Sequence, residues 1–307
     1  MTVVAFDELR TLSLDPATHP RGRSFLSAAS GLVRVRDRFF VIADDELHLG
    51  VFDAGSAPLR LVRLFDGDLP ESAKPRKKQK PDLEALVLLP ASQAGSLGTL
   101  LALGSGSRPN RFVGAMVRLD DNGDVAGAAE SVDLDPLYRS VSARVERVNI
   151  EGAFVAGDEL VLLQRGGAGA GAVNAAIRFG LDSVMAWLAA GSSAELVPRA
   201  IQEIDLGHAD GVPFSFTDGA ALDGGDWLFS AVAERTDDAY DDGPCVAALL
   251  GIADRSGRVK TMHRLEPMRK VEGIAARVVG GWVEVHMVTD DDDPTVPAAF
   301  GVTRLAV

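Results

Sequence analysis

Glu151-Gly152-Ala153-Phe154 is one of five copies of a short phrase that decides the fold. The other copies are Ser30-Gly31-Leu32-Val33, Glu84-Ala85-Leu86-Val87, Asp218-Gly219-Ala220-Ala221 and Glu272-Gly273-Ile274-Ala275. Each begins with an acidic residue, or once with serine, and continues with a small residue and an apolar pair. Successive copies lie roughly 54 to 67 residues apart, which is within the range of propeller blades and longer than most solenoid repeats.

Each phrase is followed by short runs of β-forming residues that are separated by turn residues, which predicts four strands per unit. Asp121-Asn122-Gly123 joins two such runs and is typical of a hairpin. The last unit is one strand short, and the run Val3–Leu14 has no partner. We therefore expect residues 1–307 to form one all-β domain, a five-bladed β-propeller closed by the N-terminal strand in the last blade. A six-bladed ring is the alternative, and it would need a sixth phrase.

One segment breaks the β pattern. Apolar residues in Leu181–Ala194 recur at helical spacing after Asp182, which predicts a helix with this aspartate as its N-cap. The helix would interrupt the outer pair of strands of the third blade. A shorter helical turn is expected after Asp135-Pro136, because proline suits the first helical position.

Composition limits the classes of partner. The chain of 307 residues carries a formal net charge of −13, which argues against binding to nucleic acid or to an anionic membrane. No apolar run approaches the length of a transmembrane helix, and the N-terminal residues lack the pattern of a signal peptide. Cys245 is the single cysteine, and we expect it to be a buried structural thiol. Cytoplasmic residence is the expectation from these features.

The phrases should bring four carboxylates to the axis of the ring. In a four-stranded blade, the links into the first strand and between the second and third strands lie on one face. These links are rich in polar residues, so we expect a polar funnel on that face. The carboxylates are those of Glu84, Glu151, Asp218 and Glu272.

Like charges that converge in this way ionise together only if a cation or cationic side chains compensate them. Oxygen ligands suit Ca²⁺ or Mg²⁺, so the four carboxylates are candidate metal ligands. The acidic run that begins at Asp290 follows a second strand and could reach the same mouth. Two alternatives stay open: the carboxylates cap backbone N–H groups or pair with arginines, or the copies of the phrase are misaligned.

Other polar residues of the same loops are candidates for substrate binding and catalysis. Arg108, Arg111 and Arg165 could hold a small anionic substrate together with Asn174, or they could neutralise the carboxylates. His208 is a candidate general base just before the fourth phrase, and the alternative for it is a polar loop role. The basic run 74–80 is interpreted as a solvated loop, with a lid that recruits an anion as the alternative.

In this sequence an acidic residue and glycine open an inner strand, and the second strand ends in a polar residue at the mouth. This pattern resembles that of the phytase-like β-propeller proteins, which include many with esterase-like descriptions. The resemblance implies a β-propeller over nearly the whole chain, calcium held by central carboxylates, and in some members hydrolysis of phosphate esters. Carried over to this sequence, it implies metal ligands at Glu84, Glu151, Asp218 and Glu272, with Asp44 and Asp290 beside them.

Together these patterns predict a propeller with a divalent cation in a polar funnel. Its predicted activity is metal-assisted hydrolysis of phosphate esters or lactones, with Glu151 or Asp218 as ligand or general base. The competing hypothesis is a non-catalytic binding or scaffold protein that contacts another protein through the helix at 181–194.

Overall fold

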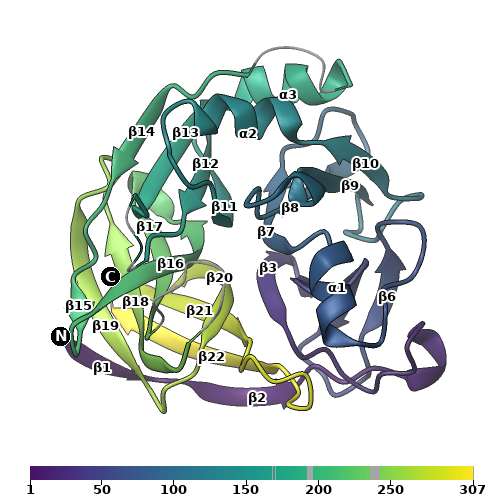
Figure 1. The fold of residues 1–307 in the computed structure, drawn as a ribbon, viewed down its shortest axis with the longest axis horizontal. Helices are drawn as coiled ribbons and strands as arrows, with labels where there is room; N and C mark the ends of the chain where they lie inside the picture. Colours follow the sequence, from purple (N-terminus) through teal and green to yellow (C-terminus); the bar gives the residue numbers. More distant parts are fainter. Residues whose placement is uncertain (168, 170, 192–195, 236–242, 307) are drawn as a thin grey trace.

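Five β-sheets surround a common axis, as Figure 1 shows in the view along that axis. The computed structural model describes residues 1–307 except 168, 170, 192–195, 236–242 and 307. Each sheet contains a four-stranded antiparallel blade, and the inner strand of each blade contacts the inner strands of its neighbours. The predicted five-bladed propeller is therefore confirmed.

The strands of each blade follow one another from the axis to the rim. Blade one consists of β3 (Ala29–Val35), β4 (Arg38–Ala43), β5 (His48–Asp53) and β6 (Arg60–Arg63). Blade two consists of β7 (Leu83–Leu89), β8 (Ser96–Gly104), β9 (Val113–Asp120) and β10 (Glu130–Asp133). Blade three consists of β11 (Ile150–Ala156), β12 (Glu159–Gln164), β13 (Ala175–Gly180) and β14 (Ala200–Glu203). Blade four consists of β16 (Val212–Ala221), β17 (Trp227–Glu234), β18 (Cys245–Ala253) and β19 (Val259–Glu266), with the short β15 (His208–Ala209) paired to β16. Blade five consists of β20 (Val271–Val279), β21 (Trp282–Thr289), β22 (Ala299–Ala306) and the N-terminal β2 (Asp7–Thr11).

Apolar side chains fill the spaces between neighbouring blades. Among the described residues they form five buried clusters, one at each junction between blades. A strand that packs against a blade on each side needs apolar residues at consecutive positions, as in the fully buried run Phe39–Ala43. This is why the central strands of the sequence read as continuous apolar runs rather than as alternating ones.

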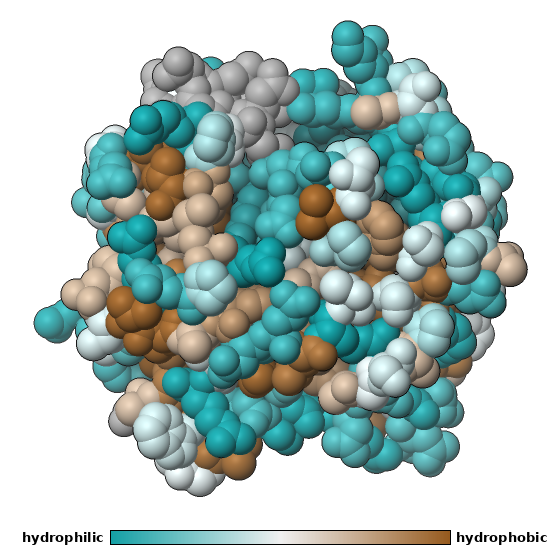
Figure 2. Space-filling model, turned by 90° about the horizontal axis from the view of Figure 1, so that it is seen from below, coloured by the Kyte–Doolittle hydropathy of each residue, from teal (hydrophilic) through white to brown (hydrophobic). Residues whose placement is uncertain are grey.

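The N-terminal segment closes the ring by pairing with two blades. β2 is the outer strand of blade five and runs antiparallel to β22, as predicted. The prediction of a single strand over Val3–Leu14 is corrected by β1 (Thr2–Ala5), which pairs parallel to β19 of blade four. Figure 2 shows the side of the molecule along which β1 and β2 run, where hydrophobic surface interrupts a largely hydrophilic one. Val3 and Leu9 are exposed on these two strands.

Three α-helices and three short 3₁₀ turns connect the described strands. The helices are α1 (Ala73–Gln79), α2 (Asp135–Ser142) and α3 (Leu181–Ala189), and the turns are Pro16–Thr18, Pro109–Arg111 and Asp223–Gly225. α2 confirms the expected turn after Asp135-Pro136. α3 begins where predicted, but its N-cap is Gly180, and Asp182 lies in the first turn without a capping hydrogen bond. The predicted end of this helix at 192–194 lies outside the described residues.

α1 and α3 both differ from solvated surface segments. Residues 74–79 of the basic run lie in α1 rather than in a solvated loop, and Lys80 is the C-cap; α1 lies at the front of the ring in Figure 1. Val184 and Trp187 of α3 are buried in the apolar cluster between blades two and three. No helix within the described residues is long and apolar enough to cross a membrane.

Candidate functional site

A β-bulge lies at the same place in every inner strand. The register between the first and second strands shifts at one residue per blade, and these residues are Ser30, Glu84, Glu151, Thr217 and Glu272. A bulge re-aims the side chain of the extra residue. Four of the five positions agree with the repeated phrase, but in blade four the bulge residue is Thr217. The sequence alignment of the fourth copy is therefore shifted by one residue.

Asp218 takes the position that glycine or alanine takes in the other blades. Its carboxylate accepts hydrogen bonds from the backbone N–H groups of Gly219 (2.7 Å) and Ile274 (2.8 Å), and also from Ala153 and Leu32. These donors belong to four different blades. Burial raises the pKa of Asp218 well above its usual range, and the four hydrogen bonds oppose that rise.

The small residues at this position make room for Asp218 at the axis. A Cβ on Gly152 would lie 2.9 Å from Asp218 Oδ1, and a Cβ on Gly273 would lie 2.9 Å from the backbone of Gly31 and Leu32. The carboxylate thus caps backbone groups at the centre of the ring, which is the alternative that the sequence left open. Asp218 does not line the polar cavity, so the structure does not bring it to the other candidate ligands.

A narrow polar cavity of about 80 Å³ lies on the axis, at the face that the loops predict. Ser30, Glu84, Glu151 and Glu272 line it from the inner strands. The remaining lining residues come from the loops and are Asp44, Lys77, Lys80, Asp82, Ser107, Arg111, Asn149, Arg165, Lys270 and Asp290. We call this cavity the funnel. A vestibule of about 470 Å³ beside α1 shares Asp44, Lys77, Lys80 and Asp290 with it.

Two lysines place ammonium groups among the funnel carboxylates. Lys80 Nζ contacts Asp44 and lies 2.9 Å from Asp82 Oδ1. Burial would lower the pKa of Lys80, but the surrounding carboxylates raise it above its usual range. On the other side of the funnel, Lys270 Nζ lies 3.3 Å from Glu272 Oε1 and 3.0 Å from Glu234 Oε1.

Two arginines also form ion pairs with carboxylates of the funnel. Arg165 bridges Glu151 (3.1 Å) and Glu234, so it joins blade three to blade four. Arg111 lies 2.6 Å from Asp82 and donates to Ser107 Oγ at 2.7 Å. The structure therefore brings Arg111 and Arg165 to the predicted site, where each makes an ion pair with a carboxylate.

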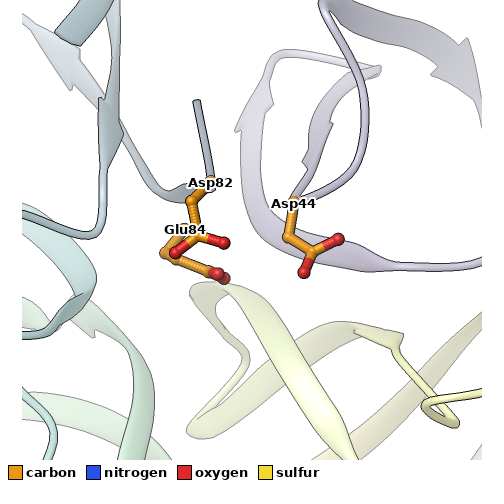
Figure 3. A group of neighbouring side chains, drawn as sticks. All are labelled: Asp44, Asp82 and Glu84. Atoms are coloured by element: carbon orange, nitrogen blue, oxygen red, sulfur yellow. The ribbon is translucent and has the colours of Figure 1, made fainter. Parts of the chain in front are cut away.

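Asp44, Asp82 and Glu84 form the group of carboxylates best placed to hold a cation. One oxygen from each lies within 4.8 Å of the others. Figure 3 shows Asp44 of blade one facing Asp82 and Glu84 of blade two. Asp82 adopts a left-handed backbone conformation with φ of 57°, which aspartate tolerates better than most residues. The donor set is made only of hard oxygen atoms, as Ca²⁺ and Mg²⁺ require.

Glu84 differs from the other two members of this group. It makes no hydrogen bond or ion pair with the part of the chain that the structure describes. Burial and the neighbouring carboxylates, Glu151 first among them, raise the pKa of Glu84 well above its usual range. A carboxyl group without a partner among like charges is the kind of group that a bound cation would stabilise.

Asp290 lies where the funnel meets the vestibule. It lines both spaces, and its Oδ1 accepts a hydrogen bond from the Asp292 N–H at 2.8 Å. Burial raises the pKa of Asp290 to about 8 and that of Asp44 to about 6. The structure thus brings both of the loop aspartates expected from the resemblance to the site.

Besides Asp218, three predicted residues lie outside the funnel lining. His208 is exposed on β15. Arg108 is exposed in the loop before Pro109–Arg111. The Asn174 side chain donates to the Phe214 carbonyl (2.7 Å) and accepts from the N–H groups of Gly166 and Phe216, so it joins the loop before β13 to β16. The structure therefore does not place these three side chains with the other candidates.

Sequence reasoning missed Asp82 and the central place of Lys80 and Lys270. Asp82, Asn149 and Lys270 each stand two residues before a bulge glutamate, and alternate residues of a strand share a face. This spacing is the signal that would have found them. Lys80 has the same relation to Asp82, but the charge run that ends there favoured a solvated loop.

The chain matches a family model over residues 25–305, and that family is described as a family of unknown function, DUF6929. The chain therefore belongs to this family. No curated protein sequence matches it. The propeller architecture that the phytase-like resemblance implies is present, while the family shown is DUF6929.

Several solved structures have a similar overall shape at low sequence identity. The catalytic domain of Coprinopsis cinerea GH62 alpha-L-arabinofuranosidase is 10% identical, with 98% of this chain and 96% of that chain covered and a TM-score of 0.49. A glycosyl hydrolase from Bacteroides ovatus is 9% identical, with coverage of 91% and 84% and a TM-score of 0.47. A gluconolactonase from Xanthomonas campestris is 10% identical, with coverage of 92% and 87% and a TM-score of 0.38. At these identities the likeness concerns shape and carries nothing about the reaction.

Proposed function

We propose that the funnel and its vestibule are the functional site, and that the protein is a hydrolase that acts on a small anionic ester or lactone with the help of a divalent cation. The observation that carries this proposal is the group Asp44, Asp82 and Glu84, whose oxygens lie within 4.8 Å of one another in the funnel, where Asp44 also lines the vestibule. The absence of a described partner for Glu84 supports the same site.

The three carboxylates would hold Ca²⁺ or Mg²⁺, with water molecules to complete the coordination shell. When bound, such an ion lowers the pKa of water and offsets the negative charge that develops during hydrolysis. The funnel itself, at about 80 Å³, is far smaller than a typical ligand pocket, so the body of the substrate would lie in the vestibule of about 470 Å³.

Lys80 has a defined part in this proposal. Its ammonium lies against Asp44 and Asp82, where the cation would bind, so the two cations compete. Because Lys80 also lines the vestibule, its side chain can turn toward that space and meet an anionic substrate there together with Lys77. Arg111 would hold Asp82 in place through their 2.6 Å contact.

The experiment combines metal content with one substitution. Protein purified without chelators is analysed by elemental mass spectrometry, and Ca²⁺ and Mg²⁺ binding is then titrated for wild type and Lys80→Met. If the ammonium withdraws to about 8 Å, its repulsion of a divalent ion is about 4 kcal/mol at an effective dielectric constant of about 20. We expect Lys80→Met to bind the ion at least about tenfold more tightly, since screening reduces this figure.

Lys270→Met is the matched control, because Lys270 is an equally buried lysine on the opposite side of the funnel. It should change the affinity much less, and Asp82→Asn should abolish binding. Binding of neither ion by wild type or Lys80→Met would reject the cation site. A screen of phosphate esters and lactones, with and without chelator, then tests the hydrolase itself.

A second candidate function is binding of a small anion without catalysis. It is favoured by the lysine and arginine contacts, since Lys80, Lys270 and Arg165 already compensate most of the carboxylates. In this case no metal binds, and chelators have no effect on ligand affinity. A protein contact through α3 stays a prediction, and the residues of α3 that are exposed are small or polar.

A further inference from the structure

A second and larger hollow lies between blades five and one, at the end of the axis opposite the funnel. Its volume is about 980 Å³, at the upper end of the range for ligand pockets. The turn between β3 and β4 and the turn after β5 contribute Asp37 and Gly55 to it, and β1 forms one wall with Val3 and Val4. None of its lining residues belongs to the funnel or the vestibule.

Three guanidinium groups in this hollow share one carboxylate. Arg277 donates to Glu284 Oε1 at 2.7 Å, and Arg304 and Arg34 lie 3.3 Å and 3.5 Å from its oxygens. Glu284 is buried, whereas the side chains of Arg277 and Arg304 are 48% and 68% exposed. Arg34 also lies 3.7 Å from Asp37 Oδ1, whereas the exposed Arg277 and Arg304 share the single carboxylate of Glu284, which cannot use all their donors, so donors remain for an anion.

His286 provides a second, independent feature of a binding site. It is only 7% exposed, it lines the hollow, and its Nδ1 has no hydrogen-bond partner among the described residues. A buried polar atom without a partner is costly unless a ligand or water satisfies it. Burial and the charge of Arg34 lower the pKa of His286 to about 4, so its ring is neutral at pH 7.

The apolar part of the exposed lining is aliphatic. Val3 is 56% exposed, and Val4 and Val302 are partly exposed. Phe39 lies beneath this surface with only 1% exposure, and the Arg34 guanidinium covers its ring at 5.3 Å from the centroid. An apolar group can pack against the three valines while an acidic group meets the arginines.

We propose that this hollow is a second ligand site, separate from the funnel, and that it binds a small organic anion with an apolar part. The arginines around Glu284 hold the acidic group beside His286, and Val3, Val4 and Val302 contact the apolar part. The proposal does not depend on the reaction assigned to the funnel.

The test uses the fluorescent aromatic sulfonate 1-anilinonaphthalene-8-sulfonate as the probe, titrated into the full-length chain. Arg304→Gln removes one exposed guanidinium and leaves Glu284 paired with Arg277 and Arg34. Val302→Trp fills the hollow without changing its charge. Because charged hydrogen bonds contribute about 1.5–3 kcal/mol, Arg304→Gln should bind the probe at least about tenfold more weakly.

Arg199→Gln is the matched control, since Arg199 is an exposed arginine paired with Asp158 at 2.9 Å in another blade. It should leave the affinity within about twofold of wild type, and circular dichroism confirms that each variant is folded. Val302→Trp should weaken binding by a similar factor to Arg304→Gln. The uncharged probe N-phenyl-1-naphthylamine should bind much more weakly than the sulfonate. Equal affinity of wild type, Arg304→Gln and Val302→Trp, equal affinity for the two probes, or no binding of the sulfonate at millimolar concentration would overturn the proposal.

Discussion

Asp218→Asn should destabilise the whole ring, because this side chain ties four blades together at the axis. The asparagine keeps one carbonyl oxygen but turns an NH₂ group toward backbone N–H groups that the carboxylate now accepts. About two of the four N–H groups would lose their acceptor in a fully buried place. At about 1–3 kcal/mol for each unpaired group, the free energy of unfolding should fall by about 2–6 kcal/mol.

The assay is urea unfolding at pH 7, followed by far-ultraviolet circular dichroism for wild type and variant. Glu84→Gln is the control, because it makes the same chemical change in a neighbouring carboxyl group of the ring. Since Glu84 lacks a described partner and lies among carboxylates, its substitution should leave stability unchanged or raise it. If the free energy of unfolding of Asp218→Asn lies within about 1 kcal/mol of the wild-type value, which is about the resolution of the method, the reasoning is refuted.

Three further predictions concern charged and thiol groups. Arg165→Gln should lower the free energy of unfolding by about 3–5 kcal/mol, because it leaves the buried Glu151 and Glu234 without this partner. Urea unfolding measures the loss, and the double variant Arg165→Gln/Glu234→Gln should recover part of it. His286 has its pKa lowered to about 4, so its contribution to stability is complete above pH 6.5 and declines as the pH falls toward 4. The thermal midpoint of wild type should therefore fall relative to that of His286→Phe as the pH drops from 6.5 to 4, and a difference that is constant with pH would contradict the assignment. Burial raises the pKa of the partly buried Cys245 to about 12, so its reaction with a thiol reagent at pH 8 should be at least about tenfold slower than in urea, because the smaller thiolate fraction outweighs the greater nucleophilicity of a more basic thiolate.

The fold could be predicted from the sequence because its signals are local and repeated. The phrase around Glu151 combines a bulge residue, a small residue for close approach at the axis, and an apolar strand, and five copies fix the number of blades. Hairpin residues such as Asp121-Asn122-Gly123 separate the strands within a blade. Even the closing role of the N-terminal segment followed from counting strands.

The details of the site were less accessible, because they depend on which residue of a strand a bulge selects. Thr217 and Asp218 are both polar, and only the register of β16 against β17 shows that the first of them takes the ring position. The Thr217 hydroxyl hydrogen-bonds to Ser230 Oγ and to the Val271 carbonyl, both at 2.7 Å, so it serves the backbone rather than the funnel. The helix at residues 73–79 was not predicted, because this run was interpreted from its high positive charge as a solvated loop.

The way in which the N-terminal segment is held has a consequence for the order of assembly. β2 pairs with β22, and β1 pairs with β19, so both strands wait for partners that lie more than two hundred residues later in the chain. Contacts of such long sequence separation form slowly, because the intervening chain must first be brought together. During synthesis on the ribosome, residues 2–11 therefore stay without their partner strands until blades four and five have emerged, so the ring closes only after the last blade has formed.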